Sequence, residues 1–147
     1  GGGNVEALSG GHHGGGRALP PHGARLGYYE APLAEGLVLV ALDTEHCHVR
    51  SWGAFHDHGA GARAQLTWLE VTLASLQRRG ARALVAGHVP PGLYSGCWGE
   101  YSERYAAVVG RYRGAVAGQL YGHVHGGGFR VLRPAGAGEE AATVAHV

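Results

Sequence analysis

Residues 83–92 read Ala-Leu-Val-Ala-Gly-His-Val-Pro-Pro-Gly, which is a short apolar run with an abrupt end. The apolar part, residues 83–87, is typical of a buried strand because it is short, continuous and uncharged. The strand has to end before Pro90 and Pro91, because proline has no backbone N–H to donate to a neighbouring strand. This segment therefore predicts a buried strand that leads into a loop beginning at His88.

Similar apolar runs lie on both sides of this segment. Residues 37–42 read Leu-Val-Leu-Val-Ala-Leu and close on Asp43 and Thr44, which predicts a buried strand that ends in a polar loop. Residues 116–121 are expected to form a third strand, which is followed by Gly-His-Val-His at residues 122–125. The candidates for a fourth and a fifth strand are residues 129–132 and residues 142–147.

The segments between these strands have the periodicity of helices. Residues 61–79 place leucines at steps of three and four along one helix face; these are Leu66, Leu69, Leu73 and Leu76. Asp57, which lies between two histidines, is expected to cap the start of this helix rather than bind a metal, and Gly80 suits the left-handed position after its end. Residues 100–112 predict a second amphipathic helix. Alternating strands and helices predict an α/β fold.

Residues 1–24 differ in composition from the rest of the chain. Nine of the first 23 residues are Gly, so the segment has too little apolar surface to offset the entropy lost on ordering. We expect residues 1–24 to form a disordered Gly/His-rich tail or loop, and residues 25–147 to form the folded part. The histidines of the tail are interpreted as solvated side chains in preference to a metal-binding tract; they are His12, His13 and His22.

The overall composition excludes some classes of function. The chain has 147 residues, which suits one domain. It carries 12 Lys and Arg against 11 Asp and Glu without a run of basic residues, so a nucleic-acid polymer is not an expected partner. No apolar run reaches the roughly 18 residues of a membrane span. Met is absent and the chain begins Gly-Gly-Gly-Asn, from which we expect a piece of a longer product.

Polar side chains follow the three central strands of this scheme. Asp43 and Thr44 come after the first strand, His88 after the second, and His123 and His125 after the third. Because ligands of open α/β sheets bind outside the carboxyl ends of the strands, these side chains are expected to meet at one site. A single histidine is more often an ordinary surface residue, so the convergence of the three histidines carries the functional signal.

The two histidine motifs resemble the last two signature blocks of the calcineurin-like metallophosphoesterases. Gly-His-Val-Pro-Pro-Gly at residues 87–92, followed after a Tyr-rich helix by Gly-His-Val-His at residues 122–125, is similar to the acid sphingomyelinase branch of that family. The resemblance extends over about residues 27–133. Three further segments support it: Gly27-Tyr28-Tyr29, Leu42-Asp43-Thr44 and residues 64–69.

The resemblance implies a fold and a metal site. The chain would be the C-terminal half of the family's αββα sandwich, and His88, His123 and His125 would be metal ligands. Such enzymes hold two divalent ions, commonly zinc in this branch; His88 and His123 would serve one ion and His125 the other. The ions polarise the phosphoryl oxygens and activate a water for in-line attack on phosphorus. The implied activity is hydrolysis of a phosphodiester, with sphingomyelin and nucleotides as candidate substrates.

The sequence also departs from the family pattern. The family's Asp-x-His, Gly-Asp-x-x-Asp and Gly-Asn-His blocks, which supply the bridging carboxylate, the other ligands and a catalytic histidine, do not occur here. Asn4 is followed by Val5 and is not given the role of the family's asparagine. Asp43 stands where relatives often have Asn, and its role is open. We therefore assign no catalytic residue and expect this chain alone to hold half of the bimetal site, with little activity.

Cys47 and Cys97 are the two cysteines of the chain. Their number permits either a disulfide or two reduced thiols. Their positions are similar to those of a disulfide pair in the sphingomyelinase branch, so the resemblance implies a bond that ties two loops of the site together. It also implies a secreted or lysosomal protein, because structural disulfides persist in oxidising compartments.

The leading hypothesis is therefore a metal-dependent phosphodiester hydrolase that resembles acid sphingomyelinase. The alternative is a catalytically inactive remnant, or a His-rich secreted module that binds one metal ion or none. Aromatic side chains beside the expected site either fill a small core or contact a lipid head group at a membrane surface; they are Trp52, Tyr94 and Trp98. The metal identity and the oligomeric state are left open.

Overall fold

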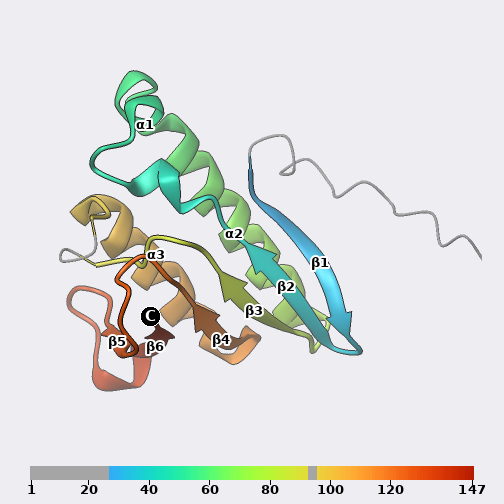
Figure 1. Ribbon diagram of the computed structural model, residues 1–147. Helices are drawn as coiled ribbons and strands as arrows, with labels where there is room; N and C mark the ends of the chain where they lie inside the picture. Colours follow the sequence, from blue (N-terminus) through green and yellow to red (C-terminus); the bar gives the residue numbers. More distant parts are fainter. Residues whose placement is uncertain (1–26, 93–95) are drawn as a thin grey trace, which may run out of the picture.

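The structure is a computed structural model that describes residues 27–92 and 96–147 (Figure 1). The expected tail, residues 1–24, and Tyr94 lie outside the described residues. The described chain forms a six-stranded sheet with the strand order β1-β2-β3-β4-β6-β5. Its strands are β1 (Tyr29–Ala34), β2 (Leu37–Ala41), β3 (Arg82–Ala86), β4 (Val116–Leu120), β5 (Phe129–Leu132) and β6 (Thr143–His146).

The four inner strands are parallel to one another. β2 pairs with β3, β3 with β4 and β4 with β6 in parallel, whereas β1 and β5 are antiparallel edge strands. In this register Val40 lies opposite Val85, and Val85 lies opposite Gln119. The carboxyl ends of β2, β3 and β4 therefore lie at the same edge of the sheet (Figure 1). The mixed sheet with its helices confirms the predicted α/β class.

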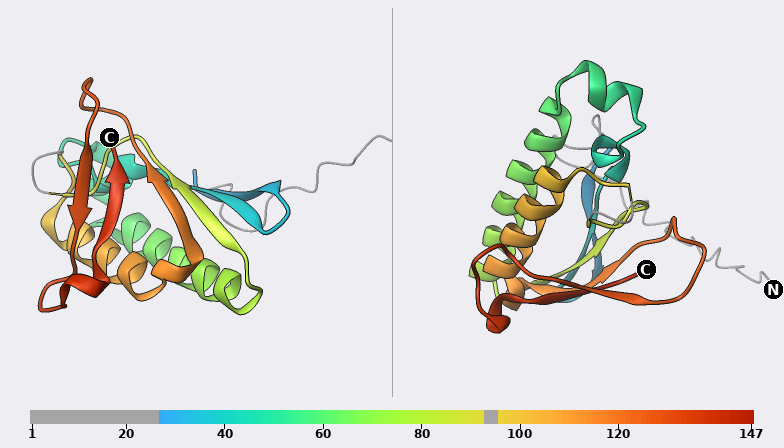
Figure 2. Two further views of the ribbon diagram at one scale, coloured as in Figure 1. Left: turned by 90° about the horizontal axis from the view of Figure 1, so that it is seen from below. Right: turned by 90° about the vertical axis from the view of Figure 1, so that its left-hand side faces the viewer.

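Both long helices pack on the same face of the sheet (Figure 2). The segment between β2 and β3 contains α2 (Ala60–Arg78), and the segment between β3 and β4 contains α3 (Gly99–Arg111), which confirms both predicted helices to within one residue at each end. Within residues 27–92 and 96–147, no helix has the length and apolar character needed to cross a membrane. The shorter helical segments are α1 (Trp52–His56), η2 (Thr44–Cys47), η4 (Arg113–Ala115) and η5 (Glu139–Ala141).

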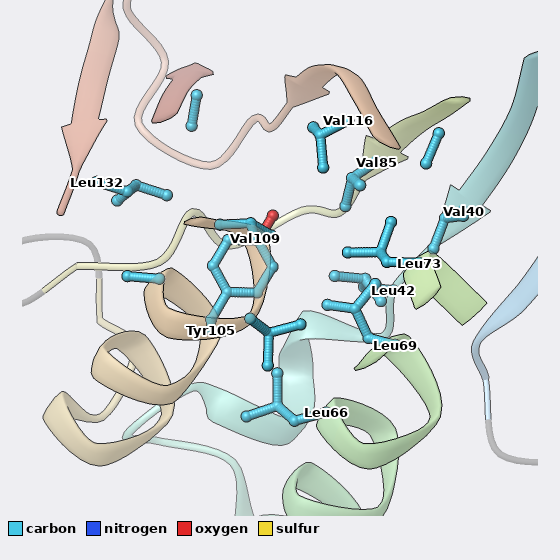
Figure 3. Packing of buried hydrophobic residues seen from close by; sticks show 14 of the residues in the cluster. Val40, Leu42, Leu66, Leu69, Leu73, Val85, Tyr105, Val109, Val116 and Leu132 are labelled. Carbon is cyan, nitrogen blue, oxygen red and sulfur yellow. The ribbon is translucent and has the colours of Figure 1, made fainter. Parts of the chain in front are cut away.

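The core lies between these helices and the sheet (Figure 3). All four leucines that the sequence places on one face of α2 are buried. They pack together with Val40 and Val85 from the strands and with Tyr105 from α3. Alternate strand residues that point away from the helices, such as Leu39 and Leu84, are only half-buried. Among the described elements, none covers that second face of the sheet (Figure 2).

Besides the three short 3₁₀ segments, the sequence-based expectation misses one strand and one helix of this fold. β1 contains Pro32 and most of its side chains are exposed, so no apolar run marks it; proline is tolerated there because β1 is an edge strand. α1 spans only five residues, too few for a helical period to be recognised. The two candidate strands at residues 129–132 and 142–147 are confirmed as β5 and β6.

Asp57 caps the start of α2 as predicted, although the N-cap position itself is Gly59. One carboxylate oxygen of Asp57 accepts the backbone N–H of Gly59 (2.8 Å) and the other accepts the N–H of Gly61 (2.8 Å). These hydrogen bonds, that from Gly61 above all, lower the pKa of the Asp57 carboxyl group. The carboxylate therefore satisfies backbone donors that the first turn of a helix leaves unpaired.

A pair of substitutions on α2 tests the placement of the core. Leu73 is fully buried (0% exposed), whereas Val71 on the same helix is 63% exposed. Leu73→Ala is expected to lower the free energy of unfolding by about 2–5 kcal/mol, because it removes buried methyl groups and leaves a cavity. Val71→Ala is expected to change it by less than about 0.5 kcal/mol. Guanidinium denaturation measures both, and equal losses would contradict this orientation of α2.

Candidate functional site

The loops that follow β2 and β3 are joined by the hydroxyl group of Thr44. Thr44 is buried, and its Oγ1 accepts the backbone N–H groups of His88 (2.9 Å) and Val89 (2.7 Å). The loop after β4 is joined to them because the Gly122 N–H donates to the carbonyl oxygen of His88 (3.0 Å). Three segments that are far apart in the sequence therefore meet at the carboxyl edge of the sheet, where such sheets bind ligands.

Two glycines lie where these loops approach each other, and one of them is needed for the close approach. A side chain on Gly87 would place its Cβ 2.7 Å from Thr44 Cγ2 and 2.9 Å from Tyr121 Cε1. A Cβ on Gly122 would stand 3.5 Å from Nδ1 of His88. Gly87 is therefore required by the packing of the loop, whereas a side chain on Gly122 would make only an ordinary contact with the Nδ1 edge of the His88 ring.

This close approach brings two of the predicted site residues together. His123 Nδ1 lies 3.3 Å from His88 Nε2, and the two rings are nearly perpendicular (89°) with their centroids 5.1 Å apart. We call His88 and His123 the imidazole pair. His123 has a φ of 74°, a left-handed conformation that is uncommon outside glycine, and such backbone strain clusters at functional sites.

His125 is exposed and also has a left-handed backbone, with a φ of 51°. In the part of the chain that the structure describes, no three His, Cys, Asp or Glu side chains are close enough together to hold a metal ion. Of the three predicted ligands, the structure thus brings His88 and His123 together, and the role of His125 stays a prediction.

His48 lies next to the imidazole pair, and sequence reasoning misses it. Its ring centroid is 5.4 Å from that of His123, with an angle of 75° between the rings. The signal that points to it is its position directly after Cys47, because the disulfide implied by the family resemblance would bring that segment to the site.

Cys47 and Cys97 form a disulfide, as the resemblance implies. Both cysteines are buried, and their Cα atoms are 4.8 Å apart although they are separated by 50 positions in the sequence. The bond connects the end of η2 to the segment that enters α3. It therefore ties the loop that carries His48 to the loop that follows the Pro-Pro-Gly turn.

Hydrogen bonds between tyrosines support the end of β4 from inside the core. The Tyr121 hydroxyl donates to that of Tyr105 (2.7 Å), which donates to the side-chain oxygen of Gln119 (2.7 Å). Gln119 in turn donates to the carbonyl oxygen of Val144 on β6 (3.1 Å). Burial raises the pKa of Tyr105, so this group stays a neutral donor. The chain of bonds holds Tyr121 directly before the Gly-His-Val-His segment.

Three other residues singled out by the sequence lie outside the imidazole pair. Asp43 caps η2, because one of its carboxylate oxygens accepts the N–H of Glu45 (3.1 Å) and the other lies 3.7 Å from His46 Nε2. Trp98 is half-buried against the core, in agreement with the core-filling interpretation. Trp52 is 79% exposed at the start of α1, so its indole is accessible for a contact with another molecule.

Comparisons with known proteins agree with the family resemblance of the histidine motifs. The chain is 31% identical to sphingomyelin phosphodiesterase A of Dictyostelium discoideum over 107 residues, which cover 72% of this chain and 18% of that protein. It is 32% identical to sphingomyelin phosphodiesterase of Bos taurus over 106 residues, with coverages of 72% and 16%. Acid sphingomyelinase-like phosphodiesterase 3b of Homo sapiens is 35% identical over 74 residues, with coverages of 46% and 16%.

These matches cover only a small part of each relative. The chain spans less than a fifth of the length of each of these three proteins. No protein-family model matches it.

Removal of the disulfide is expected to destabilise the fold. For a loop closed over 50 residues, the loss of the cross-link costs about 4 kcal/mol in the chain-entropy account. The double variant Cys47→Ser/Cys97→Ser should therefore unfold at a lower guanidinium concentration than the oxidised chain. Mass spectrometry of the alkylated chain with and without reductant provides the control. Labelling of both cysteines without reductant would contradict the disulfide.

A matched pair of glycine substitutions tests the packing of the loop after β3. Gly87→Ala would push its Cβ against Thr44 and Tyr121, and we expect overpacking to cost about 1–3 kcal/mol. Gly114 has no atom within 4 Å of the position of an added Cβ, so Gly114→Ala should not lower the free energy of unfolding. Thermal and chemical unfolding compare the two variants. A Gly87→Ala chain as stable as the wild type would show that the Thr44 contact is not as close as described.

Proposed function

Since the chain belongs to the metallophosphoesterase-type family that includes the sphingomyelin phosphodiesterases, we propose that it provides part of a metal-dependent active site for phosphodiester hydrolysis. The observation that carries the proposal is the imidazole pair at the carboxyl ends of β3 and β4. Neutral imidazoles are the usual nitrogen ligands of zinc in proteins.

The geometry of the pair fits a shared zinc ion. Two nitrogens bound to one tetrahedral zinc at about 2.0–2.1 Å are about 3.3–3.4 Å apart. The distance from His123 Nδ1 to His88 Nε2 is 3.3 Å. The residues present therefore suit this ion without a rearrangement of the backbone.

Each residue of the site then has a definite task. His88 and His123 would hold one divalent ion, and His125 would donate to a second. A bound divalent ion supplies polarisation of the phosphoryl oxygens and activation of water. Thr44 keeps the His88 loop in place through its two backbone hydrogen bonds. The chain's own contribution is to orient imidazoles at an accessible edge of the sheet.

The substrate class is proposed from the relatives. Their names identify them as phosphodiesterases, several of them acting on sphingomyelin. We propose that this chain also takes part in the hydrolysis of a phosphodiester. Sphingomyelin is the first compound to test and a nucleotide diester is the second. Peripheral contact with a lipid surface is supported by the exposed Trp52. A secreted or lysosomal location is supported by the Cys47–Cys97 disulfide.

We also propose that residues 25–147 are the C-terminal half of an αββα sandwich. Support comes from the second face of the sheet, which carries large apolar side chains with no described element over them. Val131 and Val144 are cross-strand neighbours there, 55% and 47% exposed. Leu120 on β4 and Phe129 on β5 are also exposed. Exposed apolar patches of this kind mark surfaces that another layer or partner covers. On this account the remaining metal ligands come from the other half.

A second candidate function is supported by a separate observation. Within residues 27–92 and 96–147 the protein has no group of three metal-ligating side chains. A site with only two imidazole ligands suits a module that binds one metal ion weakly and does not hydrolyse a substrate. This alternative shares the imidazole pair with the first proposal and differs from it in catalysis.

Zinc titration separates these possibilities when it is combined with an assay. All variants are made in a chain with His12, His13 and His22 replaced by alanine, so that zinc bound by these histidines does not mask the site. His88→Ala and His123→Ala should each lower zinc affinity at least about tenfold. His56→Ala on α1 is the matched control and should leave the affinity unchanged, because His56 is exposed and lies outside the imidazole pair.

Hydrolysis of bis(p-nitrophenyl) phosphate is measured on the same samples. Weak zinc-dependent turnover that disappears in His123→Ala supports the hydrolase. Zinc binding without turnover in any variant supports the non-catalytic module. If zinc binds equally well to the wild type and to both pair variants, the imidazole pair is not the metal site and the proposal fails.

A further inference from the structure

A third imidazole, that of His48, lies next to His123, with the two ring centroids 5.4 Å apart. We propose that His48 is a positioning residue for His123: it receives the N–H of His123 Nε2 through one bridging water, and so keeps the lone pair of His123 Nδ1 directed toward His88. The inference rests on the proposed function, because the consequence of this orientation is a stronger site for a divalent ion.

The backbone around His48 is held on both sides. The Val49 N–H donates to the Gly96 carbonyl oxygen (2.7 Å), and the Trp98 N–H donates to the Cys47 carbonyl oxygen (2.9 Å). His48 itself pairs with Cys97 in an antiparallel bridge, next to the disulfide. Since the segment is fixed by these contacts, the His48 ring is presented to the site rather than carried there by a free loop.

The ring nitrogens of His48 and His123 border a common space. Gly96 provides this space, because a Cβ at this position would stand 3.0 Å from His48 Nε2 and 4.0 Å from His123 Nε2. The ring centroids are 5.4 Å apart. A single water in the space beside Gly96 can bridge the two Nε2 atoms, and water-mediated hydrogen bonds are nearly as favourable as direct ones.

The two nitrogens of His123 therefore face different partners. Nδ1 faces His88 Nε2 at 3.3 Å, and Nε2 borders the space shared with His48. An imidazole that binds a metal through one nitrogen carries its proton on the other, and the acceptor of that N–H fixes both the tautomer and the orientation of the ring. His48 is placed to be this acceptor.

The alternative is that His48 only packs against His123. Two substitutions of His48 separate the effect of a hydrogen-bond acceptor from the effect of an aromatic ring. His48→Phe keeps an aromatic ring beside His123 but has no acceptor, whereas His48→Gln keeps a side-chain oxygen acceptor but has no ring. His48→Ala removes both, and His56→Ala again serves as the matched control. Circular dichroism and thermal unfolding establish that each variant is folded, and all are made in the chain that lacks the three N-terminal histidines.

The first readout needs no metal. Long-range nitrogen–proton NMR spectra report which ring nitrogen of His123 carries the proton. We expect the Nε2–H tautomer in the wild type and in His48→Gln, and a mixture of tautomers in His48→Phe and His48→Ala. The second readout is zinc affinity: His48→Phe and His48→Ala should lose about 10–100-fold, while His48→Gln should stay within about threefold of the wild type.

The outcomes distinguish this inference from the proposed function. The positioning role would be overturned if His48→Phe had the same His123 tautomer and the same zinc affinity as the wild type. It would also be overturned if His48→Phe and His48→Gln lost zinc affinity equally. Loss of one imidazole from the zinc-edge X-ray absorption spectrum of saturated His48→Ala would also overturn it, because His48 would then be a ligand. If the wild type binds no zinc but the tautomers change as expected, the proposed function fails and the water-mediated contact from His123 to His48 stands.

Discussion

The site depends on the buried hydroxyl of Thr44, which accepts the backbone N–H groups of both His88 and Val89. An unpaired buried N–H costs about 1–3 kcal/mol, so the loop after β3 is held where Thr44 can receive it. The same contact explains why residue 87 is glycine, since a Cβ there would collide with Thr44. Through this hydroxyl, the segment after β2 fixes the position of the His88 backbone, and with it the position of the His88 imidazole.

The rest of the site is built around that fixed loop. The Gly122 N–H donates to the His88 carbonyl oxygen, which sets the distance between the two imidazole-bearing segments. Tyr121 is held from inside the core by its hydrogen bond to Tyr105. On the other side, the disulfide and its neighbouring backbone hydrogen bonds hold His48. The histidines are therefore accessible side chains on backbones that are fixed by buried polar contacts, as a preorganised site requires.

The sequence was informative wherever one local pattern determined the structure. The leucines of α2 and the apolar runs of β2, β3 and β4 predicted these elements because each buries one face or one short segment against the core. The meeting of His88 and His123 followed from the parallel order of β3 and β4. β1 was missed because an exposed edge strand that contains Pro32 has no apolar period to detect.

Contacts between distant segments were beyond such patterns. The double acceptor role of Thr44 and the placement of His48 each depend on segments brought together only in the fold. His48 in particular has an unremarkable sequence context apart from Cys47 before it. The disulfide pairing was available only through the family resemblance, since two cysteines alone also permit reduced thiols.

The central claim is that His88 and His123 together hold a divalent ion. The most direct measurement is X-ray absorption at the zinc edge of the chain loaded with one equivalent of zinc, in the background without His12, His13 and His22. The account predicts nitrogen donors at about 2.0–2.1 Å with the outer-shell scattering of at least two imidazoles, reduced by one imidazole in His123→Ala. A spectrum of oxygen donors without imidazole scattering, or one unchanged in His123→Ala, would contradict it.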